Sequence, residues 1–489
     1  MLAMLTRQPP TARPPRTPTG TGHTTGHAAR ARAGGTATAP WARARAAAVV
    51  PVDASSLAVV RAVYGAVGLL SAGRLLTYGW VDSLYAAPAR HFTYPGFHWV
   101  QPPPGFGMRA LVLTMALASI LVLLGCWYRA AMAAFLVAFT WIELIDVTTY
   151  LNHYWFMTVV GLLMLVSPMA ATWSLDARRR PRAESATVPR GLVWLFRAQI
   201  SVVYVFAGIA KLNADWLLHG LPLRLWLPAR TDLAIVGPWL ALPQAAVLLS
   251  WGGALLDCSI VAFLLWRRTR VLAWLVVVAF HVATWILFPI GVFPWLMIGM
   301  TTVFFAPDWP CRAAGRLNRR VRGEARPAPD PTPAPAPGRS ARPVRPVVVA
   351  LGLVWISLQV LVPLRHFAYP GDARWTGEGY RFSWNVLAAE KSGSVEFHVT
   401  DRVTGTTRTT SAEELYTPLQ WRTMASEPEL VRQAAHALHD VAAARGQDVE
   451  VRVDAFVSIN GGAARRLIDP DVDLAAEPGR LTPQPWILR

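Results

Sequence analysis

The sequence has few charged residues, few cysteines and very few lysines. Only 16% of its 489 residues are charged, against about a quarter in soluble proteins. This scarcity, together with 53% hydrophobic residues, excludes an ordinary soluble domain and favours a membrane protein. The three cysteines, Cys126, Cys258 and Cys311, include no close pair, which excludes a CxxC zinc or redox site and a disulfide framework. Lysine occurs only as Lys211 and Lys391, although lysine and arginine together number 47.

The start of the sequence also lacks a signal-peptide pattern. No acidic residue precedes Asp53, and no apolar run follows a basic start, so we expect no cleaved signal peptide. The segment is rich in threonine, proline, alanine and arginine. We interpret residues 1–50 as a disordered basic arm.

Apolar stretches of roughly 20 residues, long enough to cross a bilayer, recur through the middle of the sequence. They predict about nine membrane-spanning helices, the eighth short enough to be re-entrant. The predicted spans are 56–76, 111–127, 130–147, 155–173, 192–212, 246–266, 271–288, 290–305 and 347–362.

The formal net charge of +18 is typical either of nucleic-acid binding or of a membrane protein with positive cytoplasmic loops. Its distribution decides between them, because every second connection is rich in arginine while the others hold few. The arginine-rich connections lie at 129, 178–182, 267–270 and 312–345. We therefore expect a cell-membrane protein with a cytoplasmic N-terminus and an extracytoplasmic C-terminal domain, and no nucleic-acid partner.

After the last predicted span the pattern changes to that of a small α+β domain. Residues 394–400 and 449–459 alternate apolar and polar side chains, as half-buried strands do. Residues 460–462, Asn-Gly-Gly, predict a hairpin turn, and 427–444 an amphipathic helix. The fold class expected is thus a polytopic α-helical membrane domain followed by a strand-rich α+β domain. The predicted parts are a catalytic membrane domain (51–310), a cytoplasmic Arg/Pro-rich linker (311–345), a last spanning helix (346–364) and the extracytoplasmic domain (365–489).

Lys211 is the first candidate for chemistry. It stands at the outer end of an apolar helix, in a chain that otherwise uses arginine for its cations. A desolvated lysine can lose its proton, whereas arginine effectively cannot. The alternative is a lysine that reaches the membrane surface and pairs with Asp215.

Two acids lie within the third predicted span. Glu143 and Asp146 are three residues apart and therefore share a helix face. Acids in a span need partners, which Arg61, Arg74 or Arg197 could supply. We expect a buried structural ion pair.

Three further polar residues are predicted to lie at the same depth as Lys211. Asn152 and His153 follow the third span, and His281 lies within the seventh. Either histidine could be a hydrogen-bonded packing residue, but polar groups that converge from separate helices indicate a site. The sequence has no phosphate-binding glycine loop, nucleophile elbow or HExxH motif, and we expect no metal.

These residues belong to segments that resemble a known family. In these segments the sequence is similar to the vitamin K-dependent gamma-carboxylase family and its bacterial relatives, which share an HTTM-type membrane domain. The similarity runs in order from about residue 56 to the C-terminus. The segments are Asp-x-Thr followed by Asn-His (146–153), Phe-Ala-Gly-x-x-Lys-Leu-x-Ala-Asp-Trp (206–216), 280–293, 375–384 and 457–473.

The resemblance implies a carboxylating carbon–carbon lyase that is also an epoxidase. Lysine deprotonates vitamin K hydroquinone (or menaquinol), which reacts with O2 to give a strong base. That base removes a γ-proton from a glutamate, the carbanion captures CO2 to give gamma-carboxyglutamate, and the epoxide is the co-product. Carried over residue by residue, the family pattern makes Lys211 the base, with Asn152 and His153 hydrogen-bonded to the quinol or the developing anion. His281 would position the quinol, and Tyr380 and Trp384 would bring the outer domain over the site.

The implied partners are a glutamate-containing peptide or protein, the lipid membrane and a quinone reductase. Ala210 and Asn213 depart from the animal members, which have lysine and aspartate there. Two alternatives remain open, a quinol epoxidase that does not carboxylate protein and a non-catalytic membrane scaffold or transporter.

Overall fold

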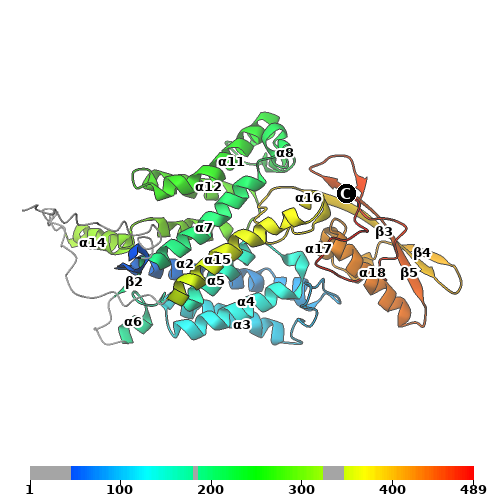
Figure 1. The fold of residues 1–489 in the computed structure, drawn as a ribbon, viewed down its shortest axis with the longest axis horizontal. Coiled ribbons are helices and arrows are strands. Elements are labelled where there is room, and N and C mark those ends of the chain that lie inside the picture. Colours follow the sequence, from blue (N-terminus) through cyan, green and yellow to red (C-terminus); the bar gives the residue numbers. More distant parts are fainter. Residues whose placement is uncertain (1–45, 180–185, 323–345) are drawn as a thin grey trace, which may run out of the picture. The chain divides into compact units, whose positions relative to one another are not determined.

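The computed structural model describes residues 46–179, 186–322 and 346–489. Residues 1–45 of the predicted basic arm (1–50) lie outside these ranges. Residues 323–345 of the predicted linker (311–345) lie outside them as well. Within the described residues, Figure 1 shows a bundle of helices followed by a part that combines helices with a sheet. We call residues 365–489 the sheet domain.

The bundle contains seven described helices that are long and apolar enough to cross a membrane. They are α2 (Ser55–Thr77), α3 (Gly107–Leu124), α4 (Tyr128–Ile145), α7 (Arg190–Ala210), α11 (Pro243–Leu265), α12 (Arg270–Leu287) and α15 (Pro346–Leu364). Each coincides with a predicted span. The chain is therefore a membrane protein with a helical membrane domain.

The predicted count of nine spans is not confirmed, because the other two are shorter apolar helices. The fourth predicted span forms α5 (Asn152–Val166), which ends before Pro168, since a residue that precedes proline disfavours helical backbone. The eighth forms α13 (Phe293–Met300), extended by one 3-10 turn, η4 (Thr301–Phe304), and preceded by Gly291 with φ +63°.

Shorter elements connect these helices. They are β1 (Pro51–Asp53), η1 (Val81–Ala86), η2 (Val147–Thr149), α6 (Leu175–Arg179), β2 (Thr187–Pro189), α8 (Ala214–His219), α9 (Leu223–Trp226), η3 (Leu227–Arg230), α10 (Gly237–Leu240) and α14 (Trp309–Arg322). The first part of the predicted linker is thus helical, as the last turns of α14.

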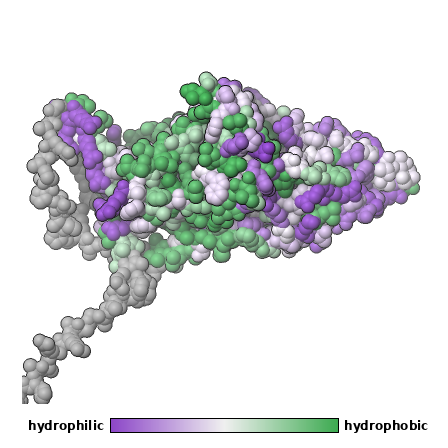
Figure 2. All heavy atoms as spheres, turned by 90° about the horizontal axis from the view of Figure 1, so that it is seen from above, coloured by the Kyte–Doolittle hydropathy of each residue, from purple (hydrophilic) through white to green (hydrophobic). Residues whose placement is uncertain are grey.

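The surface of the bundle is apolar. Figure 2 shows hydrophobic residues gathered over the helices, with hydrophilic residues concentrated beyond them on both sides. Large side chains such as Leu272 and Leu351 are more than half exposed, at 66% and 62%. Extended apolar surface of this kind is not found on monomeric soluble proteins and fits contact with lipid.

The sheet domain confirms the predicted α+β pattern. Its helices are η5 (Arg365–Ala368), α16 (Ala373–Thr376), η6 (Glu413–Leu415), α17 (Pro418–Met424) and α18 (Pro428–Ala443). Its strands are β3 (Lys391–Asp401), β4 (Thr407–Thr410), β5 (Val449–Ile459) and β6 (Arg465–Arg466). The antiparallel sheet has the order β4-β3-β5-β6, with Lys391 opposite Ile459. Alternate residues of β5 are buried, and α18 packs against this strand. Asn460 and Gly461 both have positive φ, 53° and 71°, as the predicted hairpin turn requires.

A buried arginine connects three segments of the bundle. Arg61 is 1% exposed, and its guanidinium donates to the carbonyls of Val122, Leu123 and Trp173 at 2.8, 2.8 and 2.6 Å. Two of these carbonyls belong to the last turn of α3, where carbonyls run short of intrahelical donors, although Val122 also accepts from the Gly125 N–H at 3.1 Å. Arg61 therefore satisfies the end of one helix and fixes a second segment against it.

We expect Arg61→Met to lower the free energy of unfolding by about 3 kcal/mol or more, because three carbonyls lose a charged donor. Thermal unfolding in detergent, followed by tryptophan fluorescence, measures this. Arg129→Met, at an exposed position at the start of α4, is the matched control. Equal melting temperatures for the two variants would contradict a structural role for Arg61.

Candidate functional site

A cavity of about 1200 Å³ lies at the end of the bundle next to the sheet domain. We call it the main cavity. Helices α5, α7, α11, α12 and α13 contribute to its wall, and residues 385–389 close it from the sheet-domain side. Most lining side chains are apolar, among them Val203, Leu223, Leu249, Phe280, Phe288 and Met297. The cavity therefore suits a long apolar ligand with few polar atoms.

Lys211 lies in the wall of the main cavity, buried at 5% exposure. It directly follows α7, which ends at Ala210, and two residues later the side chain of Asn213 accepts from the Trp216 N–H at 3.1 Å and caps the start of α8. The Lys211 amine turns back along α7 and donates to the Ala207 carbonyl at 3.0 Å. It also contacts the Asp257 carboxylate, with Nζ 2.9 Å from Oδ2.

Asp257 was not among the predicted site residues. This aspartate is the single charged residue of α11 and lies 46 positions from Lys211. Gly208 makes the contact feasible, because a Cβ there would lie 2.8 Å from Cys258 Sγ and 3.1 Å from the Asp257 carbonyl carbon. The glycine one turn before the lysine thus lets α7 and α11 approach closely.

The alternative partner considered for Lys211, Asp215, is wrong. Asp215 Oδ2 instead accepts from Asn460 Nδ2 at 2.9 Å and lies 3.7 Å from Arg374. Lys211 is therefore held inside the protein and does not extend to the surface.

A segment of the sheet domain, residues 380–389, covers the lysine, and we call it the covering segment. The Val386 carbonyl accepts from Lys211 Nζ at 3.3 Å. Within this segment Phe382, Trp384 and Leu387 all have left-handed backbone, with φ of 63°, 58° and 54°. Bulky residues adopt this conformation at a cost of about 1–3 kcal/mol each, and only where the surroundings enforce it. The segment is thus held by its packing in a conformation that points one carbonyl at Lys211.

Tyr380 and Trp384, the two predicted site residues of this segment, differ in their position relative to the main cavity. Tyr380 lines the main cavity, and burial raises its pKa above the usual value, so its phenol stays a proton donor at neutral pH. Trp384 is 1% exposed, packs against the Phe156 ring and is not among the residues that line the cavity. Its contribution to the site is to fix the covering segment.

His153 and His281 face the main cavity from α5 and α12. Both rings contact the Phe293 ring, at 5.7 and 5.8 Å between centroids. His281 Nε2 lies 2.9 Å from the Tyr204 hydroxyl. Two buried ring nitrogens, His153 Nε2 and His281 Nδ1, form no hydrogen bond with any described residue. Buried polar atoms in proteins normally have a partner, so a ligand with oxygen atoms fits here.

Asn152 also lines the cavity but is engaged with the protein. Its Oδ1 accepts from the Tyr150 hydroxyl at 3.0 Å, and its Nδ2 donates to the Asn385 carbonyl at 3.3 Å. Tyr150 in turn accepts from the Phe382 N–H at 2.9 Å. Asn152 therefore connects the start of α5 to the covering segment.

The predicted ion pair of Glu143 or Asp146 with an arginine is wrong. Asp146 pairs with His91, as described below. Arg61 and Arg197 donate to backbone carbonyls instead, Arg197 to those of residues 303–305. Arg74 lies over the rings of Tyr78 and Trp80. A guanidinium has five donors and satisfies the carbonyls at helix ends well, a use that charge counting along the sequence does not reveal.

Comparison with known proteins gives two matches in order along the chain. Residues 49–309 match the family model described as the HTTM domain. Residues 344–489 match the family model described as the lumenal domain of vitamin K-dependent gamma-carboxylase. No solved structure matches the chain. The first match covers the bundle with Lys211, Asp257 and both histidines, and the second covers the segment that closes the main cavity.

Proposed function

Because this chain belongs to the vitamin K-dependent gamma-carboxylase family, we propose that it oxygenates a vitamin K-type or menaquinol-type hydroquinone and carboxylates glutamate side chains. The hydroquinone supplies, with O2, the strong base that the γ-proton of glutamate requires, and CO2 is the carbon source.

The observation that carries the proposal is the buried contact between Lys211 and Asp257 in the wall of an apolar cavity. A base for a quinol hydroxyl must be neutral before it accepts a proton. The Asp257 carboxylate, 2.9 Å away, is placed to take the proton that Lys211 carries. We therefore assign to Lys211 the removal of the hydroxyl proton and to Asp257 the role of holding the lysine proton.

The main cavity fits a hydroquinone. Its apolar wall suits the isoprenoid tail, and the unpaired nitrogens of His153 and His281 suit the ring oxygens. Tyr380 is a further donor at the side of the sheet domain. Lys211 and Asp257 are each only 5% exposed, so little water reaches these two groups, as a strong base requires.

We further propose that the N-terminus and α14 lie in the cytoplasm and the sheet domain outside. Arginines of α6 and α14, such as Arg178 and Arg312, lie at the end of the bundle away from the sheet domain (Figure 1). This distribution agrees with the positive-inside rule, and the lumenal-domain match supports an extracytoplasmic sheet domain.

The test uses the detergent-purified protein with reduced vitamin K1 or a menaquinol, in the presence and absence of O2. We expect O2-dependent epoxide, detected by chromatography, and transfer of label from bicarbonate to glutamate-containing peptides. Epoxide without label in any peptide would favour the quinol epoxidase alternative. Well-folded protein that forms no epoxide with either quinol would overturn the proposal in favour of a scaffold.

A further inference from the structure

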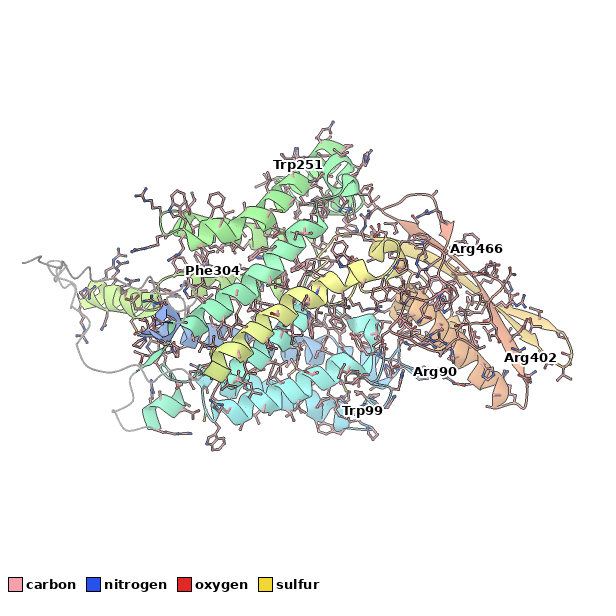
Figure 3. All side chains as sticks on the ribbon, in the orientation of Figure 1. Arg90, Trp99, Trp251, Phe304, Arg402 and Arg466 are labelled. Atoms are coloured by element: carbon pink, nitrogen blue, oxygen red, sulfur yellow. The ribbon has the colours of Figure 1, made fainter. Side chains whose placement is uncertain are left out.

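A second, polar cleft of about 240 Å³ lies between the segment that follows η1 and helix α18. We call it the polar cleft. Figure 3 places Arg90, one of its residues, where the bundle meets the sheet domain. Its ionisable lining residues are Arg90, His91, His98, Tyr416, Arg432, His436 and Asp440. The cleft thus combines five basic side chains with one carboxylate.

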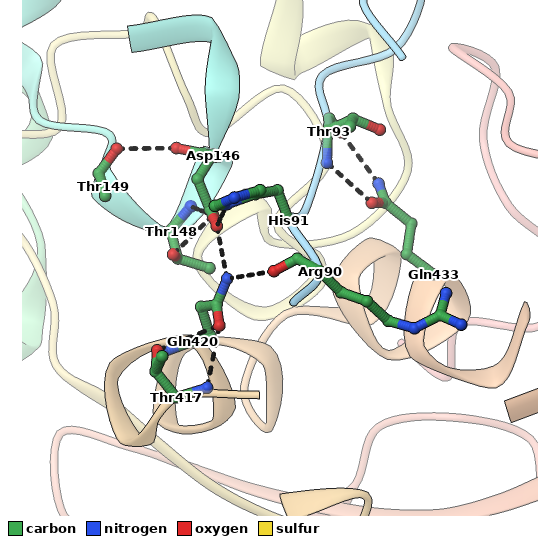
Figure 4. Close-up of polar contacts among 9 residues, drawn as sticks. All are labelled: Arg90, His91, Thr93, Asp146, Thr148, Thr149, Thr417, Gln420 and Gln433. Atoms are coloured by element: carbon green, nitrogen blue, oxygen red, sulfur yellow. Dashed lines mark hydrogen bonds and ion pairs between the residues drawn. The ribbon is translucent and has the colours of Figure 1, made fainter. Parts of the chain in front are cut away.

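His91 is held rigidly in this cleft. Its side chain is 4% exposed, and its Nδ1 lies 3.0 Å from Asp146 Oδ2. The Asp146 carboxylate also accepts from Gln420 Nε2 at 2.7 Å and from the Thr148 hydroxyl at 2.7 Å (Figure 4). His91 Nε2, on the other side of the ring, is buried and forms no hydrogen bond with any described residue. The Asp146 carboxylate thus fixes the ring on its Nδ1 side and leaves Nε2 without a partner among the described residues.

Arg90 supplies a second unused donor. Its backbone carbonyl accepts from Gln420 at 2.8 Å, while its guanidinium forms no hydrogen bond or ion pair that involves the described residues. Its side chain extends toward α18 in Figure 4. Arg432 on α18 differs, because Glu429 binds its guanidinium at 2.6 and 2.9 Å.

The other ionisable groups of the cleft have contacts of their own and form no hydrogen bond or ion pair with the Arg90 guanidinium among the described residues. His98 Nδ1 lies 2.7 Å from the Thr93 hydroxyl, and His436 Nε2 lies 2.8 Å from the Glu477 carbonyl. Asp440 is exposed and lies 3.9 Å from His439. The Arg90 guanidinium has no partner among the described residues, and it lies in a cleft the size of one side chain beside the His91 ring, whose Nε2 also has none. A free guanidinium in such a cleft forms a recognition site for a carboxylate.

We propose that the polar cleft binds an acidic side chain of the peptide whose glutamate enters the main cavity. Asp146, behind the cleft, and Asn152, in the wall of the main cavity, are six residues apart. Their Cα atoms are therefore within about 20 Å of each other. About 20 Å is the upper limit of that separation, so an extended peptide with two acidic residues up to about six positions apart can reach both residues. The acidic residue in the polar cleft is inferred from the cleft alone. The glutamate in the main cavity rests on the proposed function.

The test measures binding and needs no catalysis. A fluorescein-labelled peptide with two glutamates six residues apart is titrated with the full-length protein in detergent, and its anisotropy is recorded. We expect Arg90→Ala to weaken binding roughly tenfold or more, as loss of a charge-assisted hydrogen bond does. Arg422→Ala is the matched control, because Arg422 is exposed on α17 and is not among the residues that line the cleft. Arg90→Lys is expected to recover part of the affinity.

Further arms separate this inference from the proposed function. Lys211→Arg is expected to bind the peptide as the wild type does, and Arg90→Ala to form epoxide at the wild-type rate without peptide. Equal binding by Arg90→Ala and Arg422→Ala would overturn the inference whether or not the protein forms epoxide. Glutarate that competes as strongly as the peptide would overturn the peptide as occupant and indicate a free small anion.

Discussion

Replacing Lys211 with arginine is expected to lower epoxide formation by a factor of roughly 10²–10⁴, the range that a general base contributes. Arginine keeps the positive charge and can still pair with Asp257, but it does not give up its proton in proteins. The substitution therefore separates a catalytic amine from a structural cation. Lys211→Met is expected to be equally inactive.

Lys391→Arg is the matched control, since these two residues are the only lysines of the chain. Lys391 is also buried, where it donates to the Trp375 carbonyl at 3.0 Å and lies 3.7 Å from Glu427. Burial lowers the pKa of Lys391, and Glu427 opposes that shift, but this lysine is not among the residues that line the main cavity. Initial rates of epoxide formation compare the two variants at equal thermal stability. An active Lys211→Arg enzyme would show that Lys211 is not the base.

Replacing Asp257 with asparagine is expected to lower the rate about 100-fold, within the range of proton-transfer catalysis. Asparagine keeps the size and one hydrogen bond to Lys211 but cannot accept the lysine proton. Removing one partner of a buried pair also leaves the charge of the other partner uncompensated, so the stability of the variant must be measured alongside its rate.

Asp215→Asn is the control for this variant, because Asp215 is four residues from Lys211 in sequence but contacts Asn460 and Arg374 instead. We expect it to retain activity. A rate for Asp257→Asn equal to or above that of the wild type would mean that burial alone keeps Lys211 neutral. Asp257 would then be only a structural partner of the lysine.

The sequence was sufficient to locate the seven long apolar helices of the described residues and several residues of the main cavity, but not Asp257. Lys211, Asn152, His153, His281 and Tyr380 were all predicted, and all line the cavity. The signal was strong because an ionisable residue stands out within an apolar helix. Their roles in the reaction stay predictions.

The pairings of these residues could not be predicted. Asp257 is as conspicuous in its helix as Lys211, but its contact depends on how closely α7 and α11 approach at Gly208. Asp146 was assigned an arginine, whereas the partner is a histidine of a loop, supported by Gln420 from the sheet domain. Helical periodicity tells which face of its helix a residue occupies. It does not tell which polar residue of another segment packs against that face.

The contact between Lys211 and the Val386 carbonyl joins parts of the chain that the ribosome makes at different times. The lysine, its aspartate and both histidines are synthesised more than 90 residues before the segment that covers them. A growing chain therefore carries the basic groups in a chamber that still lacks one wall and is open to water. On the proposed function, we expect fragments left by interrupted translation to form no epoxide, because the cavity is complete only when the last domain has folded against the membrane helices.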